Sequence, residues 1–248
     1  MLKYQYDHDE WCYDEPKTKK AGKLKIPSIP GVLPFAGVRT PSHISATSQH
    51  VFYTYKVRAT GWEPQVGICE SLAEYAVCEQ CLVSPDIYNL ETQPVQVKYR
   101  HEGVARNHTF DVRLTFANGY RRLIFVRNRK SLLKPRTQGE IDSILKATTR
   151  EHANDVVIVE ADQYTRAHRE NLSRMRLAVE HPDPLSDEAV LRVFDSARNI
   201  IWVKDIYPHT EFSKPRVFDS CNRLIACGEL CANLSNVFSK HSRIWRRK

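Results

Sequence analysis

Alternating apolar and polar positions predict strands through the middle of the chain. The clearest alternation begins near Gln49, where Val51, Tyr53 and Tyr55 share one face. Asn118-Gly119 separates two further alternating runs and is a strong two-residue hairpin signal. The predicted strands lie at about 92–100, within a hairpin at 108–128, and at 155–160, the last being a short apolar run typical of a buried strand.

Apolar positions spaced by three or four residues predict helices at about 68–83, 138–151, 164–180 and 186–198. Thr137 followed by Glu140 has the pattern of a capping box at the start of the second helix. The element order favours an α/β or α+β fold with one central sheet. We divide the chain into an extended, basic, proline-containing arm (1–45), a sheet domain (46–160) and a mostly helical region (161–248).

Composition fits a soluble protein with a substantial core. The 248 residues are 42% hydrophobic and 27% charged. No apolar run approaches the roughly 18 residues that cross a membrane, and the acidic, aromatic segment 1–15 lacks a signal-peptide core. We therefore expect a cytoplasmic protein without a membrane partner.

The net charge of +8 favours a polyanionic partner. Two acid-free basic clusters carry much of this charge, although solvated basic faces would give the same pattern. The predicted nucleic-acid contacts are Arg121, Arg122, Arg127, Arg129, Lys130, Lys134 and Arg136 in the first cluster, and Arg243, Arg246 and Arg247 in the second. Double-stranded DNA is the expected partner, and Trp245 either contacts nucleic acid or anchors the tail.

Seven cysteines, an odd number at irregular spacing, argue against a secreted disulfide framework. Cys78 and Cys81 form one CxxC on a helical pattern, without a second pair to complete a zinc site. Buried free thiols are the simpler interpretation. The nine glycines form neither a phosphate-binding loop nor a nucleophile elbow.

Two acids and one cation are the candidate chemistry. Glu70 lies at the start of the first predicted helix and Asp111 at the start of the hairpin, while Arg127 ends the hairpin. Carboxylates from neighbouring elements can hold Mg²⁺, and a cation beyond them can stabilise charge at a phosphate. Simpler roles remain open, because an acid in a first helical turn complements the helix dipole and an edge-strand acid can face solvent.

Residues 69–128 resemble the amino-terminal domain of TnsA-type transposase endonucleases. The motifs that carry the resemblance are Glu70-Ser71, Gln93-Pro94, His108-Thr109-Phe110-Asp111 and Phe125-Val126-Arg127. A weaker likeness continues through Val156–Glu160 and the segment from Leu224 to Leu234. The resemblance implies a PD-(D/E)xK, restriction-endonuclease-like fold, with a central mixed sheet flanked by helices.

The resemblance also implies that Glu70 and Asp111 bind Mg²⁺, with Gln93 and His108 supporting them. The final motif departs from the family. Phe125 stands where a third ligand is expected and cannot ligate, and Arg127 stands in place of lysine. Arginine binds phosphate well but is a poor proton donor and acceptor. Lys98 or Lys130 could substitute in principle, although Lys98 precedes Asp111.

Three functions follow from these observations. The favoured one is a DNA-binding protein on a degenerate nuclease scaffold, which acts with a transposase or integrase, or as an assembly factor. The second is an active Mg²⁺-dependent endonuclease in which Glu70, Asp111 and Arg127 are catalytic. The third is a basic protein-interaction module.

Overall fold

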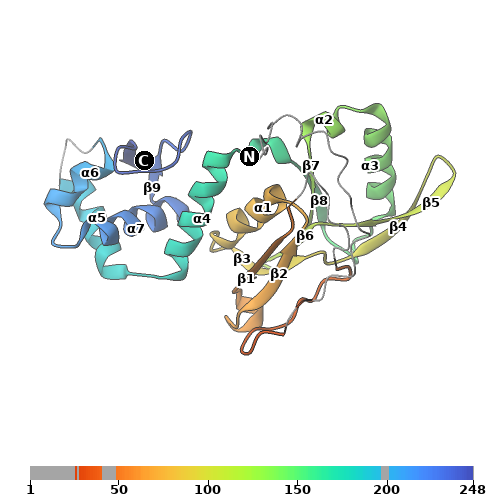
Figure 1. The fold of residues 1–248 in the computed structure, drawn as a ribbon, viewed down its shortest axis with the longest axis horizontal. Coiled ribbons are helices and arrows are strands. Elements are labelled where there is room, and N and C mark those ends of the chain that lie inside the picture. The colour runs from red at the N-terminus through yellow and green to blue at the C-terminus, as the bar shows by residue number, and fades with distance from the viewer. Residues whose placement is uncertain (1–25, 27, 41–48, 197–200, 248) are drawn as a thin grey trace, which may run out of the picture.

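The computed structural model describes residues 26, 28–40, 49–196 and 201–247 (Figure 1). The strands up to residue 160 lie at one end of the long axis with helices α1 (Leu72–Leu82) and α3 (Pro135–Ala147). The last helices lie at the other end, and α4 (Arg166–Glu180) stands between the two groups. The chain is thus a mixed α/β protein, as its patterns predict.

The central sheet has four strands in the order β3, β6, β7, β8. They are β3 (Ile87–Thr92), β6 (Val112–Phe116), β7 (Arg121–Arg127) and β8 (Asp155–Glu160). The first two pairings are antiparallel and β7 pairs with β8 in parallel. Because parallel neighbours need a crossover, α3 and the short α2 (Arg129–Leu132) occupy the connection from β7 to β8.

Alternation along β7 gives the sheet two apolar faces. Ile124 and Val126 join the core cluster that contains Ala76 and Val77 of α1. Leu123 and Phe125 point the other way, into the cluster that contains Ile141 and Ile144 of α3. Successive side chains of a strand face opposite sides, so α1 and α3 cover opposite faces of one sheet.

Two smaller antiparallel sheets flank the central one. In the first, β1 (Val51–Tyr55) pairs with β2 (Gln65–Cys69), and the one-turn helix η2 (Arg58–Thr60) lies between them. In the second, β4 (Gln96–His101) pairs with β5 (Val104–Thr109). Glu140 ties this hairpin to α3, because its Oε1 accepts hydrogen bonds from Tyr99 Oη at 2.6 Å and Arg106 Nη1 at 3.0 Å.

Two predicted elements have different limits in the structure. The helix predicted at 68–83 begins at Leu72, because residues up to Cys69 belong to β2. The strand predicted at 92–100 corresponds to β4, which lies outside the central sheet, and only its first residue, Thr92, belongs to β3. The predicted strand at 155–160 is confirmed as β8, but its residues are only partly buried and Ile158 is exposed.

The second predicted helix also starts elsewhere. α3 begins at Pro135, and Lys134 precedes it without a side-chain cap. Thr137 is therefore inside the helix, and the predicted capping box is wrong because Glu140 is engaged by Tyr99 and Arg106. The hairpin at Asn118-Gly119 is confirmed, with Gly119 at φ 82°, but its loop has three residues (117–119) instead of the predicted two, because Phe116 N donates to Tyr120 O.

The carboxy-terminal elements enclose a separate core. They are α5 (Pro184–Ser196), α6 (Val203–Ile206), α7 (Lys214–Ala226), β9 (Leu230–Ala232) and β10 (Ile244–Arg246). Val190, Val217, Leu224 and Phe238 are among the residues of this core. The mostly helical character is as predicted, and the small β9–β10 sheet is an addition.

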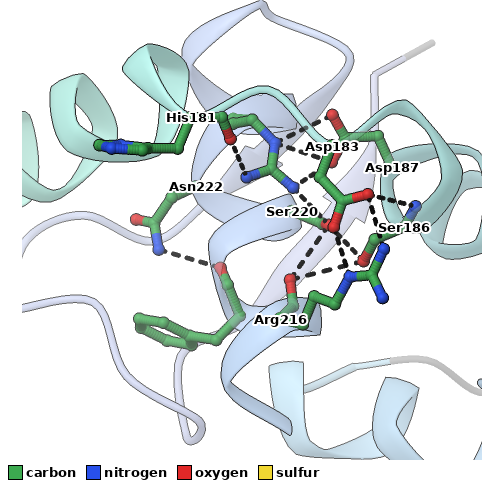
Figure 2. Close-up of polar contacts among 9 residues, drawn as sticks. His181, Asp183, Ser186, Asp187, Arg216, Ser220 and Asn222 are labelled. Atoms are coloured by element: carbon green, nitrogen blue, oxygen red, sulfur yellow. Dashed lines mark hydrogen bonds and ion pairs between the residues drawn. The ribbon is translucent and has the colours of Figure 1, made fainter. Parts of the chain in front are cut away.

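Polar contacts fix α5 against α7 (Figure 2). Asp187 accepts from Arg223 at 2.7 Å, and Asp183 accepts from Arg216 at 2.5 Å. Between these pairs, Ser220 Oγ donates to Ser186 Oγ at 2.7 Å in a fully buried position. Arg223 Nη1 also donates to the backbone oxygen of His181 at 3.0 Å. These contacts fix the orientation of α7 along its length.

Residues 28–40, here called the strap, cross the first small sheet. Leu33 bridges Gln65 in parallel, and Val38 N donates to Gln93 O at 2.9 Å. The arm predicted at 1–45 is therefore a strap over the body where it is described, while residues 1–25, 27 and 41–48 lie outside the described part. No helix in the described residues is long and apolar enough to span a bilayer.

Candidate functional site

Asp111 is the centre of the site. It lies in the break between β5 and β6, and the residue is only 8% exposed. Its Oδ2 accepts a hydrogen bond from Val126 N at 2.7 Å, and its backbone oxygen accepts one from Gln93 N at 2.9 Å. Its own amide donates to Ile124 O at 3.2 Å. Asp111 is thus held where β3, β6 and β7 meet.

Glu70 lies just before α1 rather than in its first turn. Ser71 is the N-cap, and its Oγ accepts from Glu74 N at 3.2 Å. Glu74 Oε2 in turn accepts from Glu70 N at 2.8 Å, one residue before the N-cap, so the arrangement is a variant of the capping box. Glu74 is a site residue that the sequence interpretation missed. The Ser71-x-x-Glu74 spacing was the signal that could have found it.

These acids form one electrostatic group with Arg127. Burial raises the pKa of Asp111 well above its usual range, and the charges of Glu74 and Glu70 add to that rise. Arg127 and the hydrogen bond from Val126 oppose it. Burial likewise raises the pKa of Glu74, against the charge of Arg127. The charges of the predicted residues Glu70 and Arg127 therefore both act on Asp111.

The predicted third ligand position is apolar. Phe125 is 4% exposed and packs in the core beneath α3. The Arg127 guanidinium lies over its ring, 4.2 Å from the centroid. The His108 ring meets the same ring edge-on, with centroids 4.3 Å apart. Phe125 is therefore a packing residue that also seats Arg127.

His108 and Gln93 do not support Asp111 through their side chains in the described contacts. His108 Nε2 and Gln93 Oε1 are both buried without a hydrogen-bond partner among the described residues. Burial, followed by the charge of Arg127, lowers the pKa of His108 to about 4, so the ring is neutral at pH 7. Gln93 has φ 52°, a strained backbone for a residue with a side chain.

The strap contributes a second cation that the sequence interpretation did not include. Arg39 donates from Nη2 to Glu70 Oε1 in an ion pair. Both side chains are partly exposed, so the pair lies at the mouth of the site rather than within it. One Glu70 oxygen is thereby engaged by the chain's own arginine.

The carboxylates as arranged do not fit a magnesium ion. Among the residues described, no three or more His, Cys, Asp or Glu side chains are grouped to hold a metal. Mg²⁺ requires near-octahedral oxygen coordination. One Asp111 oxygen faces Val126, one Glu70 oxygen faces Arg39, and Phe125 supplies no ligand atom. The final motif, which departs from the family pattern, thus leaves the set of metal ligands incomplete.

An exposed basic rim continues from the site. It consists of Arg127, Arg129, Lys130 and Lys134, which follow β7 into α2 and α3. None of the four forms an ion pair with a carboxylate in the described part of the chain. Arg136 lies beyond them, 3.5 Å from an oxygen of the exposed Glu102.

The other predicted contacts are elsewhere. Arg121 and Arg122 begin β7, at the opposite end from Arg127, and Arg122 is held by Asp155 at 2.7 Å. Arg246 pairs with Asp195 at 3.3 Å. Arg243 lies over the Trp202 ring at 5.6 Å, and Arg247 is exposed. The first basic cluster is therefore not one continuous surface.

No protein-family model matches this chain, and no curated protein matches it. The geometry of its own residues therefore carries the functional argument.

Proposed function

We propose that this protein binds double-stranded DNA on a TnsA-like, restriction-endonuclease-like scaffold and has lost or weakened cleavage. It would act with a transposase or integrase, or as an assembly or regulatory factor. The observation that carries the proposal is the basic rim, which begins at Arg127 near the buried Asp111 and whose side chains form no ion pair in the described chain. Asp162 is the one carboxylate bound there among the described residues, and it accepts from the backbone amide of Arg129 at 2.6 Å. In this proposal the rim binds phosphates. Glu70 and Asp111 keep the positions of acids inherited from a nuclease ancestor.

The order of elements supports the nuclease-like scaffold. After α1 come β3, the separate β4–β5 hairpin, and β6 and β7, which pair antiparallel with each other while β6 also pairs antiparallel with β3. Then come α2 and α3, and β8 pairs in parallel with β7. The resemblance leads us to expect this order, together with acids at the start of the helix and at the centre of the sheet. The influence of the Glu70 charge on the pKa of Asp111 supports this part of the proposal.

The rim has the chemistry of a phosphate-contacting surface. Exposed lysines and arginines neutralise phosphates and release counterions, which supplies most non-specific DNA affinity. Arg127 adds a planar fork that can contact two phosphate oxygens, and its stacking on Phe125 limits the freedom of that fork. Side chains held in this way lose less entropy on binding.

Base reading by α7 has less support. α6 and α7 follow one another as in a helix-turn-helix, in which the second helix enters the major groove. Here α7 packs against both α4 and α5, and its Asn222 and Arg223 are buried. We therefore assign DNA contact to the exposed arginines and lysines of the rim rather than to the face of α7.

Loss of cleavage is supported by the centre of the site. Phe125 offers no ligand, the guanidinium of an arginine is a poor proton donor and acceptor, and His108 is neutral and buried. None of these three can both bind a metal and manage a proton at the phosphate. Hydrolysis through these residues lacks a general base.

Salt-dependent binding of a fluorescent duplex tests the proposal. We expect a steep loss of affinity with added salt, and Lys130→Ala or Lys134→Ala should each reduce the slope of log K against log salt by about 1. Lys146→Ala is the matched control. It removes an exposed lysine near the other end of α3 from Lys134, about 18 Å away at 1.5 Å per residue, and should leave the slope unchanged.

Supercoiled plasmid with Mg²⁺ or Mn²⁺ tests the second candidate, an active endonuclease. That candidate is favoured by the influence of the Glu70 charge on Asp111. Nicking that Asp111→Ala abolishes would establish it and contradict the loss of cleavage. No affinity for duplex at low salt would instead leave the protein-interaction module.

A further inference from the structure

A cavity of about 400 Å³ opens between the sheet domain and α4. Its walls come from the segment after β1, the end of α1, and α4, and most of the lining side chains are apolar. Val57, Leu82, Val83, Ile87 and Val179 are among them. A volume of this size is typical of sites that hold a ligand or a bulky side chain. No part of the function proposed above uses this cavity.

Trp62 stands at the edge of the cavity in an unfavourable state. Its φ is 67°, in the left-handed region that residues with side chains rarely adopt, and it is 59% exposed. Its amide is nonetheless fixed, donating to Val57 O at 3.0 Å. A strained backbone that presents an indole to solvent beside an apolar cavity is a feature of binding surfaces.

The charge around the cavity favours an acidic occupant. Lys56, Arg58 and Arg176 line it with a single acid, Glu180. Arg176 is already paired with Glu180 at 2.5 Å. Lys56 and Arg58 form no ion pair with a described carboxylate, and Arg58 Nη2 donates only to Pro85 O at 2.9 Å. An occupant with an aromatic group and carboxylates would satisfy both the walls and the rim.

The chain contains such a segment near its amino terminus. Residues 4–15 contain four aromatic residues (Tyr4, Tyr6, Trp11 and Tyr13) and five acids (Asp7, Asp9, Glu10, Asp14 and Glu15) and no lysine or arginine. Before Leu33 the strap turns back, because Val32 N donates to Ile29 O at 3.1 Å, and Ile26 and Ser28 line one pocket with Pro34 and Phe35. The chain between Trp11 and Ile26 can span up to about 50 Å.

We propose that residues 4–15 dock in this cavity, with Trp11 against Trp62 and the apolar walls and with their carboxylates beside Lys56 and Arg58. Tethering gives the segment an effective concentration in the millimolar range, so a weak contact suffices. The basic rim is the competing surface for the acids, but it offers no apolar cavity for the aromatic rings. The inference is independent of the proposed DNA binding.

Photo-crosslinking in the full chain tests the docking. The variant Tyr13→p-benzoylphenylalanine keeps Trp11 and places the reactive group two residues away. After irradiation, mass spectrometry should locate intrachain cross-links on Trp62, Val83 or Val179. Adding Trp11→Ser should lower the yield at these positions at least about fivefold, as expected for the loss of a buried aromatic anchor. Adding Trp62→Ser should act in the same direction.

Tyr88→Ser is the matched control, because Tyr88 is also an exposed aromatic residue, at 45%, and does not line the cavity. It should leave the yield unchanged. Cross-links to the basic rim would overturn the proposal in favour of a segment that covers the DNA surface. Cross-links between chains that grow with concentration would assign the cavity to a second copy. A yield insensitive to Trp11→Ser would also overturn it, since that variant removes the proposed anchor.

Discussion

At the scale of single residues, Asp111 combines burial with like charges nearby, and both raise its pKa. The folded protein therefore holds this proton more tightly than the unfolded chain does. Ionising the carboxyl costs folding free energy as the pH rises from its unfolded pKa of about 3.9 through the folded value. An acid kept at such a cost is more typical of a functional position than of a packing position.

Asp111→Asn should therefore stabilise the fold. The amide oxygen can still accept from Val126 N, while the buried charge is removed. We expect a gain of about 1 kcal/mol near pH 8, or about 2–4 °C in Tm for a chain of this size. The gain should vanish near pH 4, where the aspartate is protonated in both states. Thermal melts of both proteins from pH 4 to 8 measure it.

The pKa shift of His108 has the opposite sign, and its effect on stability must be separated from that of Asp111. Because its folded pKa is about 4, protonation of the unfolded chain destabilises the fold as pH falls from about 6.5 toward 4. That loss occurs in both proteins, so it cancels in the difference between their Tm values. A difference that is constant with pH would show that Asp111 carries no charge penalty. Glu170→Gln, which alters an exposed acid, should show no gain.

At the scale of elements, the sequence pattern predicted which helices and strands form better than it predicted where they begin and end. The spacing in 68–83 predicted a helix, but Cys69 is paired in β2, and a four-residue apolar run looks the same in either state. The missed β3 shows the same limit, because its short sequence carries no clear alternation. Propensity and period are local, whereas strand pairing is decided by partners far along the chain.

The residues of the site were likewise predictable only in part. Glu70 and Asp111 could be chosen because motifs fix their order, and the capping spacing of Ser71 and Glu74 was readable as well. Arg39 could not be chosen, since its contact with Glu70 spans 31 positions and depends on the path of the strap. The buried side-chain atoms of Gln93 and His108 that lack a hydrogen-bond partner likewise result from packing. No sequence motif predicts that they lack a partner.

Gly37→Ala should release the strap. A Cβ at this position would lie 2.2 Å from Phe35 Cζ and 2.7 Å from Thr92 O, and the second atom is backbone and cannot give way cheaply. We expect residues 28–40 to be cut faster by a protease, with only a small change in global Tm because the strap lies outside the cores. Limited proteolysis followed by mass spectrometry measures the rate. Val38→Ala, at a 59% exposed neighbour, should cut at the original rate.

At the scale of the whole molecule, two cores are joined through α4. The central sheet and the carboxy-terminal helices bury separate apolar clusters, and α4 contacts α1 on one side and α7 on the other. Glu79 of α1 is fully buried at this joint. It accepts from Ser173 Oγ at 2.7 Å and from Arg176 Nε at 3.3 Å, both on α4. A buried acid with partners on one helix fixes the register of that helix.

Glu79→Ala should therefore uncouple the two cores. The loss costs about 1–3 kcal/mol, because Ser173 Oγ loses its acceptor and Arg176 keeps only Glu180 as an ion-pair partner. Calorimetry should show the single unfolding transition split into two, with the carboxy-terminal core melting first. Glu170→Ala removes an exposed pair with Arg174 on the same helix and should change stability by less than about 0.5 kcal/mol. If Glu79→Ala left one transition at the original temperature, the joint would be held by apolar packing alone. The cavity beside Trp62, which α4 closes with Val179, would then keep its shape without this acid.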